Sequence, residues 1–304
     1  MRLVSFGPRG AEGPAVLDGE ELVPLAPLLR RLGIAVPDMN AVLGLWDHLA
    51  PMVADEVESR TAERLELGSV RLGPPVPRPV NVVGVGRNYG EAAPDEPHPV
   101  PILFAKPVTA LIGPEDPIVR PAATETLDYE AELAVVIGRS GRHIEVREVP
   151  RHVAGYTIGS DVTAFDVMFP GHADRPDAMP AMLLQQLRGK GHDTFLPLGP
   201  AIVTADEAGD PDDLEIITTV NGEERQRAHA ADMLVGIDRL VAEVSAVLTL
   251  HPGDVILTGT PPGIGLQQDP PAFLAAGDVV EITIPTLGRL RNEIVDEPRE
   301  VLSR

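Results

Sequence analysis

The sequence predicts an α+β protein that is mostly β, and three observations lead to this fold class. Most apolar segments after residue 80 are short, of strand length, and are separated by Gly, Pro or Asp. Only one later segment has a convincing helical spacing of apolar residues. A proline-rich stretch at residues 73–81 divides this part from a shorter N-terminal part with mixed patterns. Many short strands with few helices favour a folded-over sheet rather than a doubly wound one.

Residues 1–72 are expected to form a small N-terminal α+β domain. A short strand is predicted at Arg2–Phe6, followed by turns and then by helical periodicity around Leu22–Leu32 and Met39–Ala50. Four prolines in the next nine residues, GPPVPRPVN, are typical of a linker. We therefore expect a second, larger domain at residues 73–304.

The larger domain is expected to consist of successive strands and one helix. Strand-like apolar runs lie at Asn81–Val85, Ile102–Ala105, Glu130–Ile137, Val153–Ile158, Leu214–Val220, Val255–Thr258 and Val279–Ile284. Apolar residues from Ile237 to Leu248 fall at helical spacing, and their shared face is interpreted as core. Asp232 is expected to cap this helix, and Pro252-Gly253 to end it.

The composition excludes several classes of protein. The chain has 304 residues, of which 43% are apolar, enough for a packed core. Its net charge of −21 makes nucleic acid and anionic membranes poor partners. Without cysteine it has no disulfide, thiolate nucleophile or iron–sulfur cluster. The N-terminus does not read as a signal peptide, and no apolar run approaches the ~20 residues of a membrane span, so a cytoplasmic location is expected.

The basic residues are almost all arginine. Of the 25 basic side chains only two, Lys106 and Lys190, are lysines. Such a bias is usual for a genome rich in arginine codons, but a compact and titratable ammonium group also has uses that a guanidinium does not. The two lysines are therefore candidates for a functional role.

Three carboxylates form the clearest candidate for a functional site. Glu130 and Glu132 are two residues apart on a predicted strand, so their side chains leave the same face. Asp161 ends the next strand. Clustered carboxylates repel one another and lose hydration, and a cation removes both penalties. Carboxylates without His or Cys suit Mg²⁺, Mn²⁺ or Ca²⁺. The alternative is that both glutamates face solvent.

Two further segments are candidates for contact with a ligand. Lys190 lies between glycines in GKGHDTFLPLGP, where the backbone is able to approach a ligand closely. Its ammonium would stabilise an enolate or move a proton, although on spacing alone a solvated surface lysine is more common. In LTGTPPGIG a strand ends at Gly259, and Thr260 would offer its hydroxyl and backbone N–H to a substrate carboxylate. An ordinary Pro-Gly turn is the alternative there.

Several other motifs are absent. GVGRNYG spaces its glycines one residue too widely for the dinucleotide fingerprint. Neither a phosphate-binding G-x-x-x-x-G-K-[ST] loop nor a G-x-S-x-G nucleophile elbow occurs. The eight histidines are scattered, which argues against a zinc site.

Taken together and in this order, the motifs of the larger domain resemble the fumarylacetoacetate hydrolase family. The resemblance runs from about Val82 to Ile294. It is carried by VVGVGRNYG, PILFAKP, DYEAELAVVIGRSGRHI, GYTIGSDVTAFD, GKGHDTFLPLGP, VNGEERQ, VILTGTPPGIG and AGDVVEITIPTLGRLRNEI. Residues 1–72 resemble the variable N-terminal domain that many members carry.

The resemblance implies a catalytic domain of mixed β-roll or β-sandwich type, in a homodimer, with a magnesium-type ion at its mouth. It implies that Glu130, Glu132 and Asp161 are the metal ligands and that Lys190 and Thr260 act on the substrate. It also places a further group near the substrate, namely Arg87, Tyr89, Phe165 and Gly259. The expected cofactor is Mg²⁺, with Mn²⁺ or Ca²⁺ as alternatives.

Two departures from the family pattern bear on the reaction. Members typically carry N-Y-x-x-H-x-x-E on a lid, where the His–Glu pair activates a water, but here Ala92 and Asp95 stand in their place. Phe165 stands where an arginine would meet substrate oxygens, which predicts a preference for an apolar substrate portion. His98 or His172 would supply a replacement base, although a lone loop histidine is more often solvated.

The expected function is that of an enzyme acting on a 2-oxo acid or 1,3-diketone through a metal-bound enolate. Hydrolysis of a C–C bond is the default that the resemblance implies. Tautomerisation, decarboxylation or dehydration is nearly as well supported, because enolate chemistry can proceed without an activated water. The rival from another class is a catalytically silent member that binds metal only, and the retention of all three carboxylates and Lys190 argues against it.

Overall fold

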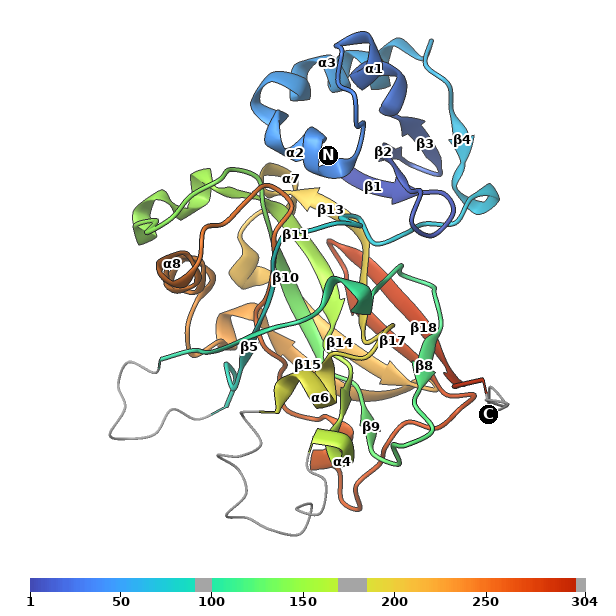
Figure 1. Cartoon of the computed structure of the whole chain (residues 1–304), viewed down its shortest axis with the longest axis vertical. Coiled ribbons are helices and arrows are strands. Elements are labelled where there is room, and N and C mark those ends of the chain that lie inside the picture. Colours follow the sequence, from blue (N-terminus) through green and yellow to red (C-terminus); the bar gives the residue numbers. More distant parts are fainter. Residues whose placement is uncertain (91–99, 169–184, 299–304) are drawn as a thin grey trace, which may run out of the picture.

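The computed structural model describes residues 1–90, 100–168 and 185–298. Its strands form two main sheets and a small third one (Figure 1). The largest sheet follows the order β4 (Leu65–Glu66), β3 (Glu21–Pro24), β2 (Gly13–Asp18), β1 (Arg2–Phe6), β13 (Leu196–Thr204), β11 (Val153–Ser160), β10 (Ala131–Ile137), β16 (Val255–Leu257), β5 (Val82–Gly86) and β6 (Ile102–Ala105). A short strand, β7 (Leu111–Ile112), pairs with β13 beside this path.

The second main sheet packs against the first and closes the core. Its order is β15 (Glu223–His229), β14 (Glu215–Val220), β17 (Val279–Ile284), β18 (Gly288–Asp296) and β8 (Ile118–Arg120). Buried side chains of both sheets, such as Leu133 and Ile158 on one and Ile282 and Leu290 on the other, belong to one apolar cluster. Burial of that shared apolar area is what holds the two sheets face to face. The small sheet joins β9 (Leu127–Asp128) to β12 (Thr163–Ala164).

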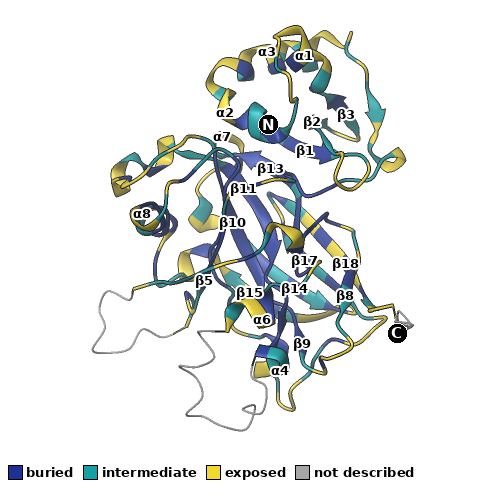
Figure 2. Cartoon of the chain, viewed as in Figure 1, coloured by how far each residue is buried: buried dark blue, intermediate teal, exposed yellow. Residues whose placement is uncertain are grey.

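The helices lie outside the sheets. The bounds are α1 Ala26–Arg31, α2 Met39–Gly44, α3 Trp46–Ser59, α4 Phe165–Met168, α6 Gln186–Lys190, α7 Ala205–Ala208 and α8 Ile237–Val247. In Figure 2 the exposed residues gather on the helices and loops, whereas β10, β11 and β13 are almost entirely buried. Within the described ranges no helix is long and apolar enough to cross a membrane. The predicted fold class, α+β and mostly β, is confirmed.

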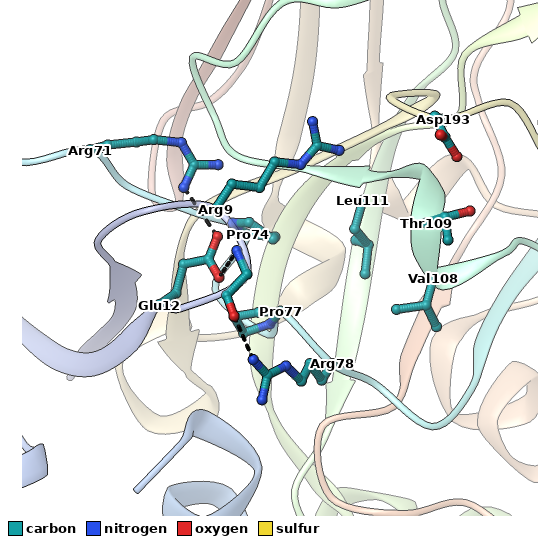
Figure 3. A pocket seen from close by; sticks show the side chains of 11 residues that line it. Arg9, Glu12, Arg71, Pro74, Pro77, Arg78, Val108, Thr109, Leu111 and Asp193 are labelled. Atoms are coloured by element: carbon teal, nitrogen blue, oxygen red, sulfur yellow. Dashed lines mark hydrogen bonds and ion pairs between the residues drawn. The ribbon is translucent and has the colours of Figure 1, made fainter.

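The N-terminal part extends the large sheet rather than standing apart from it. β1 pairs antiparallel with β13, with Arg2 opposite Val203 and Leu3 opposite Ile202. Arg71 adds a polar connection, because its Nε donates to Asp116 Oδ1 at 2.8 Å and its Nη1 to Glu12 Oε1 at 3.1 Å. Arg71 and Glu12, which face each other in Figure 3, help to line a hollow of about 330 Å³ between the two parts of the chain.

The structure corrects three of the predicted elements. The helix expected around Met39–Ala50 is divided into α2 and α3, because Leu45 between them does not have helical backbone angles. The helix expected from Leu22 begins only at Ala26, because Leu22 and Val23 are buried in a hairpin strand opposite Leu17 and Val16. Two adjacent apolar residues are compatible with a helix or with a strand, and here the pairing with the preceding strand determines that they form a strand.

Asp232 does not cap the long helix. The residue at the cap is Gly236, with no side-chain hydrogen bond, while the Asp232 carboxylate accepts from His229 N–H in a preceding turn. The helix also ends at Val247, before Pro252. Its predicted core face is confirmed, with Ile237, Leu240, Val241 and Val244 all buried.

Candidate metal centre

Two adjacent strands bring the three predicted carboxylates together. β10 and β11 pair antiparallel with Glu132 opposite Gly159, and the Asp161 N–H donates to the Glu130 carbonyl at 2.8 Å. Glu130 directly precedes β10, and Asp161 directly follows β11. One carboxylate oxygen from each of the three residues lies within 4.8 Å of the others, and all three residues are buried. The antiparallel pairing of β10 and β11 therefore places the Asp161 carboxylate next to those of Glu130 and Glu132.

Both lysines of the chain contact this cluster. Lys190 Nζ donates to Asp161 Oδ2 at 2.6 Å, to Glu130 Oε2 at 2.8 Å and to Thr163 Oγ1 at 2.7 Å. Lys106 Nζ, whose side chain is fully buried, lies 2.5 Å from Asp161 Oδ1. Each carboxylate oxygen of Asp161 thus accepts a hydrogen bond from one lysine ammonium. The two lysines that stood out in the sequence lie side by side at the same aspartate.

Burial and charge act differently on the three carboxyl groups. Burial raises the pKa of Glu132 well above its usual value, and the negative charges of Asp161 and Glu130 raise it further. Burial also acts to raise the pKa of Asp161, but Lys106 and Lys190 outweigh it and hold that pKa below its usual value. No lysine bonds to Glu132, which instead accepts the Gly259 N–H at 2.6 Å. Glu132 is thus the member of the cluster that has no directly bonded ammonium group.

The segment after β16 is shaped to reach the cluster. Gly259 has φ +100°, which favours glycine, and a Cβ there would lie 2.8 Å from Asn88 Cβ. Thr260 follows, half-buried, and its hydroxyl oxygen accepts from Gln226 Nε2 at 2.8 Å. The rest of the segment is anchored by Asp128, whose carboxylate accepts the N–H of Gly265 at 2.7 Å. Thr260 therefore belongs to a fixed turn beside Glu132.

The Asn88-Tyr89 pair is held at the same end of the sheet. The Asn88 Nδ2 donates to the carbonyls of Thr258 at 2.8 Å and Val235 at 3.0 Å. The Tyr89 hydroxyl is buried and has no hydrogen-bond partner within residues 1–90, 100–168 and 185–298. Burial raises the pKa of Tyr89, and the charge of Glu132 adds to the effect. Arg87, in contrast, is exposed, with φ +57°.

The aromatic ring of Phe104 packs against the ammonium group of Lys190. The Lys190 Nζ lies 5.4 Å from the centroid of the Phe104 ring, a cation–π distance. The ring occupies the space over Gly84 on the paired strand, where a Cβ would lie 2.2 Å from Phe104 Cζ. The glycines beside Lys190 serve packing too, since a Cβ at Gly189 would lie 2.5 Å from Met168 Cε. Close packing within the protein thus gives a reason for glycine beside Lys190.

Of the remaining predicted residues, one is described and four lie outside the described residues. Phe165 begins α4 and is half-buried, and its N–H donates to the Thr126 carbonyl at 3.2 Å. The substituted lid positions Ala92 and Asp95 lie in residues 91–99, outside the described residues. The two candidate bases, His98 and His172, lie in residues 91–99 and 169–184, also outside them.

Comparison with known proteins agrees with this geometry. The family profile described as fumarylacetoacetate (FAA) hydrolase C-terminal matches residues 80–295. The chain belongs to the fumarylacetoacetate hydrolase family. The resemblance stated from the motifs is confirmed, and the chain is an enzyme of the hydrolase and isomerase type.

Relatives within the family carry several activities. An oxaloacetate tautomerase of Bos taurus, FAHD2A, named mitochondrial, is 43% identical over 224 residues, or 73% of this chain and 68% of that protein. A 2,4-didehydro-3-deoxy-L-rhamnonate hydrolase of a Sphingomonas species is 36% identical over 97% of this chain and 96% of that protein. The solved maleylpyruvate hydrolase of a Sphingobium species, in complex with manganese(II) and pyruvate, has a TM-score of 0.78 at 30% identity, covering 97% and 99% of the two chains.

The buried residues of this family member fit a divalent cation. The donor set consists of carboxylate oxygens only, which suits a hard ion such as Mg²⁺ or Mn²⁺. Glu132 accepts no hydrogen bond from either lysine, and a cation bound beside it would stabilise its ionised form. Glu130, Glu132 and Asp161 would hold the ion.

Sequence reasoning did not assign a place in this site to Thr163, Gln226 and Asn88. Each contributes a hydrogen bond to a residue far along the chain, such as Thr163 Oγ1 to Glu130 Oε1 at 3.0 Å. No spacing rule points to such a contact. For Lys106, the scarcity of lysine was the signal available in the sequence.

Proposed function

We propose that this chain is a divalent-metal-dependent enzyme that acts on a 2-oxo acid or 1,3-diketone through its enolate, with hydrolysis of a C–C bond as the default reaction. The observation that carries the proposal is the buried cluster of Glu130, Glu132 and Asp161 in contact with Lys106 and Lys190. We propose Mg²⁺ as the ion, with Mn²⁺ or Ca²⁺ as alternatives.

The charges of the site favour an anionic substrate. If all three carboxylates are ionised, as metal ligands are, and both lysines are charged, the five side chains carry one net negative charge in a buried place. A divalent cation changes this to one positive charge, which the carboxylate of a 2-oxo acid neutralises. A buried site with balanced charge costs much less than one with a net charge.

A bound divalent ion supplies Lewis-acid polarisation of the substrate oxygens. The chain's own groups would then act on the enolate. The Lys190 ammonium, held by Glu130 and Asp161 above the Phe104 ring, would stabilise negative charge on the enolate oxygen or carry a proton to carbon. The Tyr89 hydroxyl, which is buried and has no hydrogen-bond partner among the described residues, and the Thr260 hydroxyl would bind substrate oxygens.

Tautomerisation is the second candidate, and decarboxylation or dehydration would use the same enolate. Ala92 and Asp95 replace the histidine and glutamate that activate water in hydrolytic members, and a tautomerase relative is 43% identical. Keto–enol exchange needs proton transfer at carbon but no water nucleophile. Phe165 in place of arginine favours substrates with an apolar portion. A cytoplasmic location stays a prediction.

Metal binding and turnover test the proposal together. Calorimetry with Mg²⁺ and Mn²⁺ should detect a site in the wild type and in Glu125→Gln, an exposed carboxylate of the same segment, but not in Glu130→Gln. Assays should then compare acylpyruvate cleavage with keto–enol exchange of oxaloacetate. Equal metal binding by Glu130→Gln would remove the site, and metal binding without turnover of either substrate class would favour a catalytically silent protein.

A further inference from the structure

The side chain of Gln226 connects three separate parts of the candidate site. Gln226 lies on β15 and is 1% exposed. Its Oε1 accepts from the Ala131 N–H at 3.3 Å and from Thr218 Oγ1 at 2.9 Å. Its Nε2 donates to Thr260 Oγ1 at 2.8 Å and to the Pro261 carbonyl at 2.7 Å. One amide thus bridges the residue between Glu130 and Glu132 and the turn that carries Thr260.

The surroundings fix which end of the amide faces which partner. A backbone N–H only donates, so Ala131 requires the oxygen of Gln226 on its side. A backbone carbonyl only accepts, so Pro261 requires the nitrogen. If the amide were flipped, its NH₂ group would face the Ala131 N–H and its oxygen would face the Pro261 carbonyl. Both buried backbone groups would then lose their hydrogen bonds.

This orientation determines the role of the Thr260 hydroxyl. Both hydrogens of Gln226 Nε2 are used, one of them on Thr260 Oγ1. Because the threonine oxygen accepts from Gln226, its own hydrogen is directed elsewhere. Among the residues that the structure describes, none accepts this hydrogen. Thr260 is half-buried and follows Gly259, which bonds to Glu132, so the turn that carries this hydroxyl is in contact with the metal centre.

We propose that Gln226 is a positioning residue that sets the Thr260 hydroxyl as a hydrogen-bond donor, so that the substrate group bound there is an acceptor, a carboxylate or carbonyl oxygen. The inference rests on the proposed function, which places Thr260 on the substrate. It adds a selection rule, since a ligand group that only donates, such as an ammonium or an amide N–H, would face a second donor at this point and bind poorly.

Pyruvate in the presence of Mn²⁺ is the probe, and calorimetry gives its dissociation constant. Thr260→Val and Gln226→Met should each weaken pyruvate binding by about tenfold, the loss of one hydrogen bond to a charged group. In the double variant the two losses should not multiply, because Gln226 acts through the Thr260 hydroxyl. Thr260→Ser, which keeps the hydroxyl, should bind like the wild type. Mn²⁺ affinity without pyruvate should stay unchanged in all variants.

Several outcomes would overturn the inference. Multiplied losses in the double variant, or a parallel loss of Mn²⁺ affinity in Gln226→Met, would show that Gln226 is merely structural. If Gln226→Met does not fold, Gln226→Glu, of the same size, replaces it: its carboxylate accepts the Thr260 hydrogen and should weaken pyruvate binding equally, whereas unchanged binding would contradict the proposal. A wild type that binds Mn²⁺ but not pyruvate would overturn both this inference and the proposed substrate class. Normal wild-type binding with unaffected variants would overturn this inference alone.

Discussion

At the scale of single residues, the arrangement of Lys106 and Lys190 shows how a fold keeps several charges inside it. The Lys190 ammonium bonds to Glu130, Asp161 and Thr163, while the Lys106 ammonium bonds to no described residue other than Asp161. Burial lowers the pKa of Lys106, and Asp161 opposes that effect. Asp161 is therefore the partner on which the charged state of Lys106 depends.

Removing Asp161 should be more damaging than removing Lys106. Asp161→Asn leaves a fully buried ammonium without an anionic partner, which should cost ~3–5 kcal/mol of unfolding free energy. Lys106→Met should cost less, because Asp161 keeps its bond to Lys190. The double variant should be more stable than Asp161→Asn alone. Urea unfolding in the presence of a chelator measures all three, and a double variant less stable than Asp161→Asn would contradict this account.

The site residues differ in how far the sequence could predict them. Glu130, Glu132 and Asp161 follow from strand spacing and from a family motif, and the structure brings them together. Gln226 and Asn88 escaped prediction, since their role depends on which backbone groups face one amide in three dimensions. The hydrogen-bond partners of an amide side chain cannot be recognised from the sequence around it.

At the scale of elements, several strands with apolar runs were predicted, but the largely buried strands β2 and β13 and the polar strand β15 were not. β6 and β17 match their predicted bounds, and β10 begins one residue later than expected. β15, with the sequence EERQRAH, was missed because it lies at the edge of its sheet with mostly exposed or half-buried side chains. Its single buried polar residue, Gln226, is nevertheless the one that reaches the site.

A substitution at Gly84 on β5 tests whether the position of the Phe104 ring matters for Lys190. Gly84→Ala would place a Cβ 2.2 Å from Phe104 Cζ and displace the ring beneath Lys190. A cation–π contact contributes ~0.5–2 kcal/mol, so kcat/KM should fall between about twofold and thirtyfold. Gly86→Ala on the same strand is the matched control, because its Cβ would meet Ile102 at an ordinary 3.5 Å. Equal activity losses in both variants would show that the ring is not the cause.

At the scale of the whole molecule, the first prediction concerns the number of chains in the assembly. The family resemblance implies a homodimer, and light scattering should therefore give a mass of about twice the 32.4 kDa of one chain. The apolar residues Val108 and Leu187, exposed at 38% and 66%, offer surface for such contacts. A mass of one chain across micromolar concentrations would contradict the dimer.

The division into residues 1–72 and 73–304 leads to the second prediction at this scale, because β1 is hydrogen-bonded to β13 across that boundary. Leu3 and Val16 share an apolar cluster with Val136 and Ile202 of the larger part. Two parts that share a sheet and a core should unfold together. We therefore propose that the N-terminal part is structurally continuous with the catalytic sheet and melts in one transition with it.

The only tryptophan, Trp46, lies on α3 of the N-terminal part and reports on it directly. Its fluorescence and the far-ultraviolet circular dichroism of the whole chain should change at the same temperature. Leu3→Ala, at a fully buried position, should cost ~2–5 kcal/mol and lower both midpoints together. Leu45→Ala, at a position 40% exposed in the same part, should leave both nearly unchanged. If Leu3→Ala lowers only the Trp46 midpoint, residues 1–72 unfold on their own, and the shared core with β13 contributes little to cooperativity.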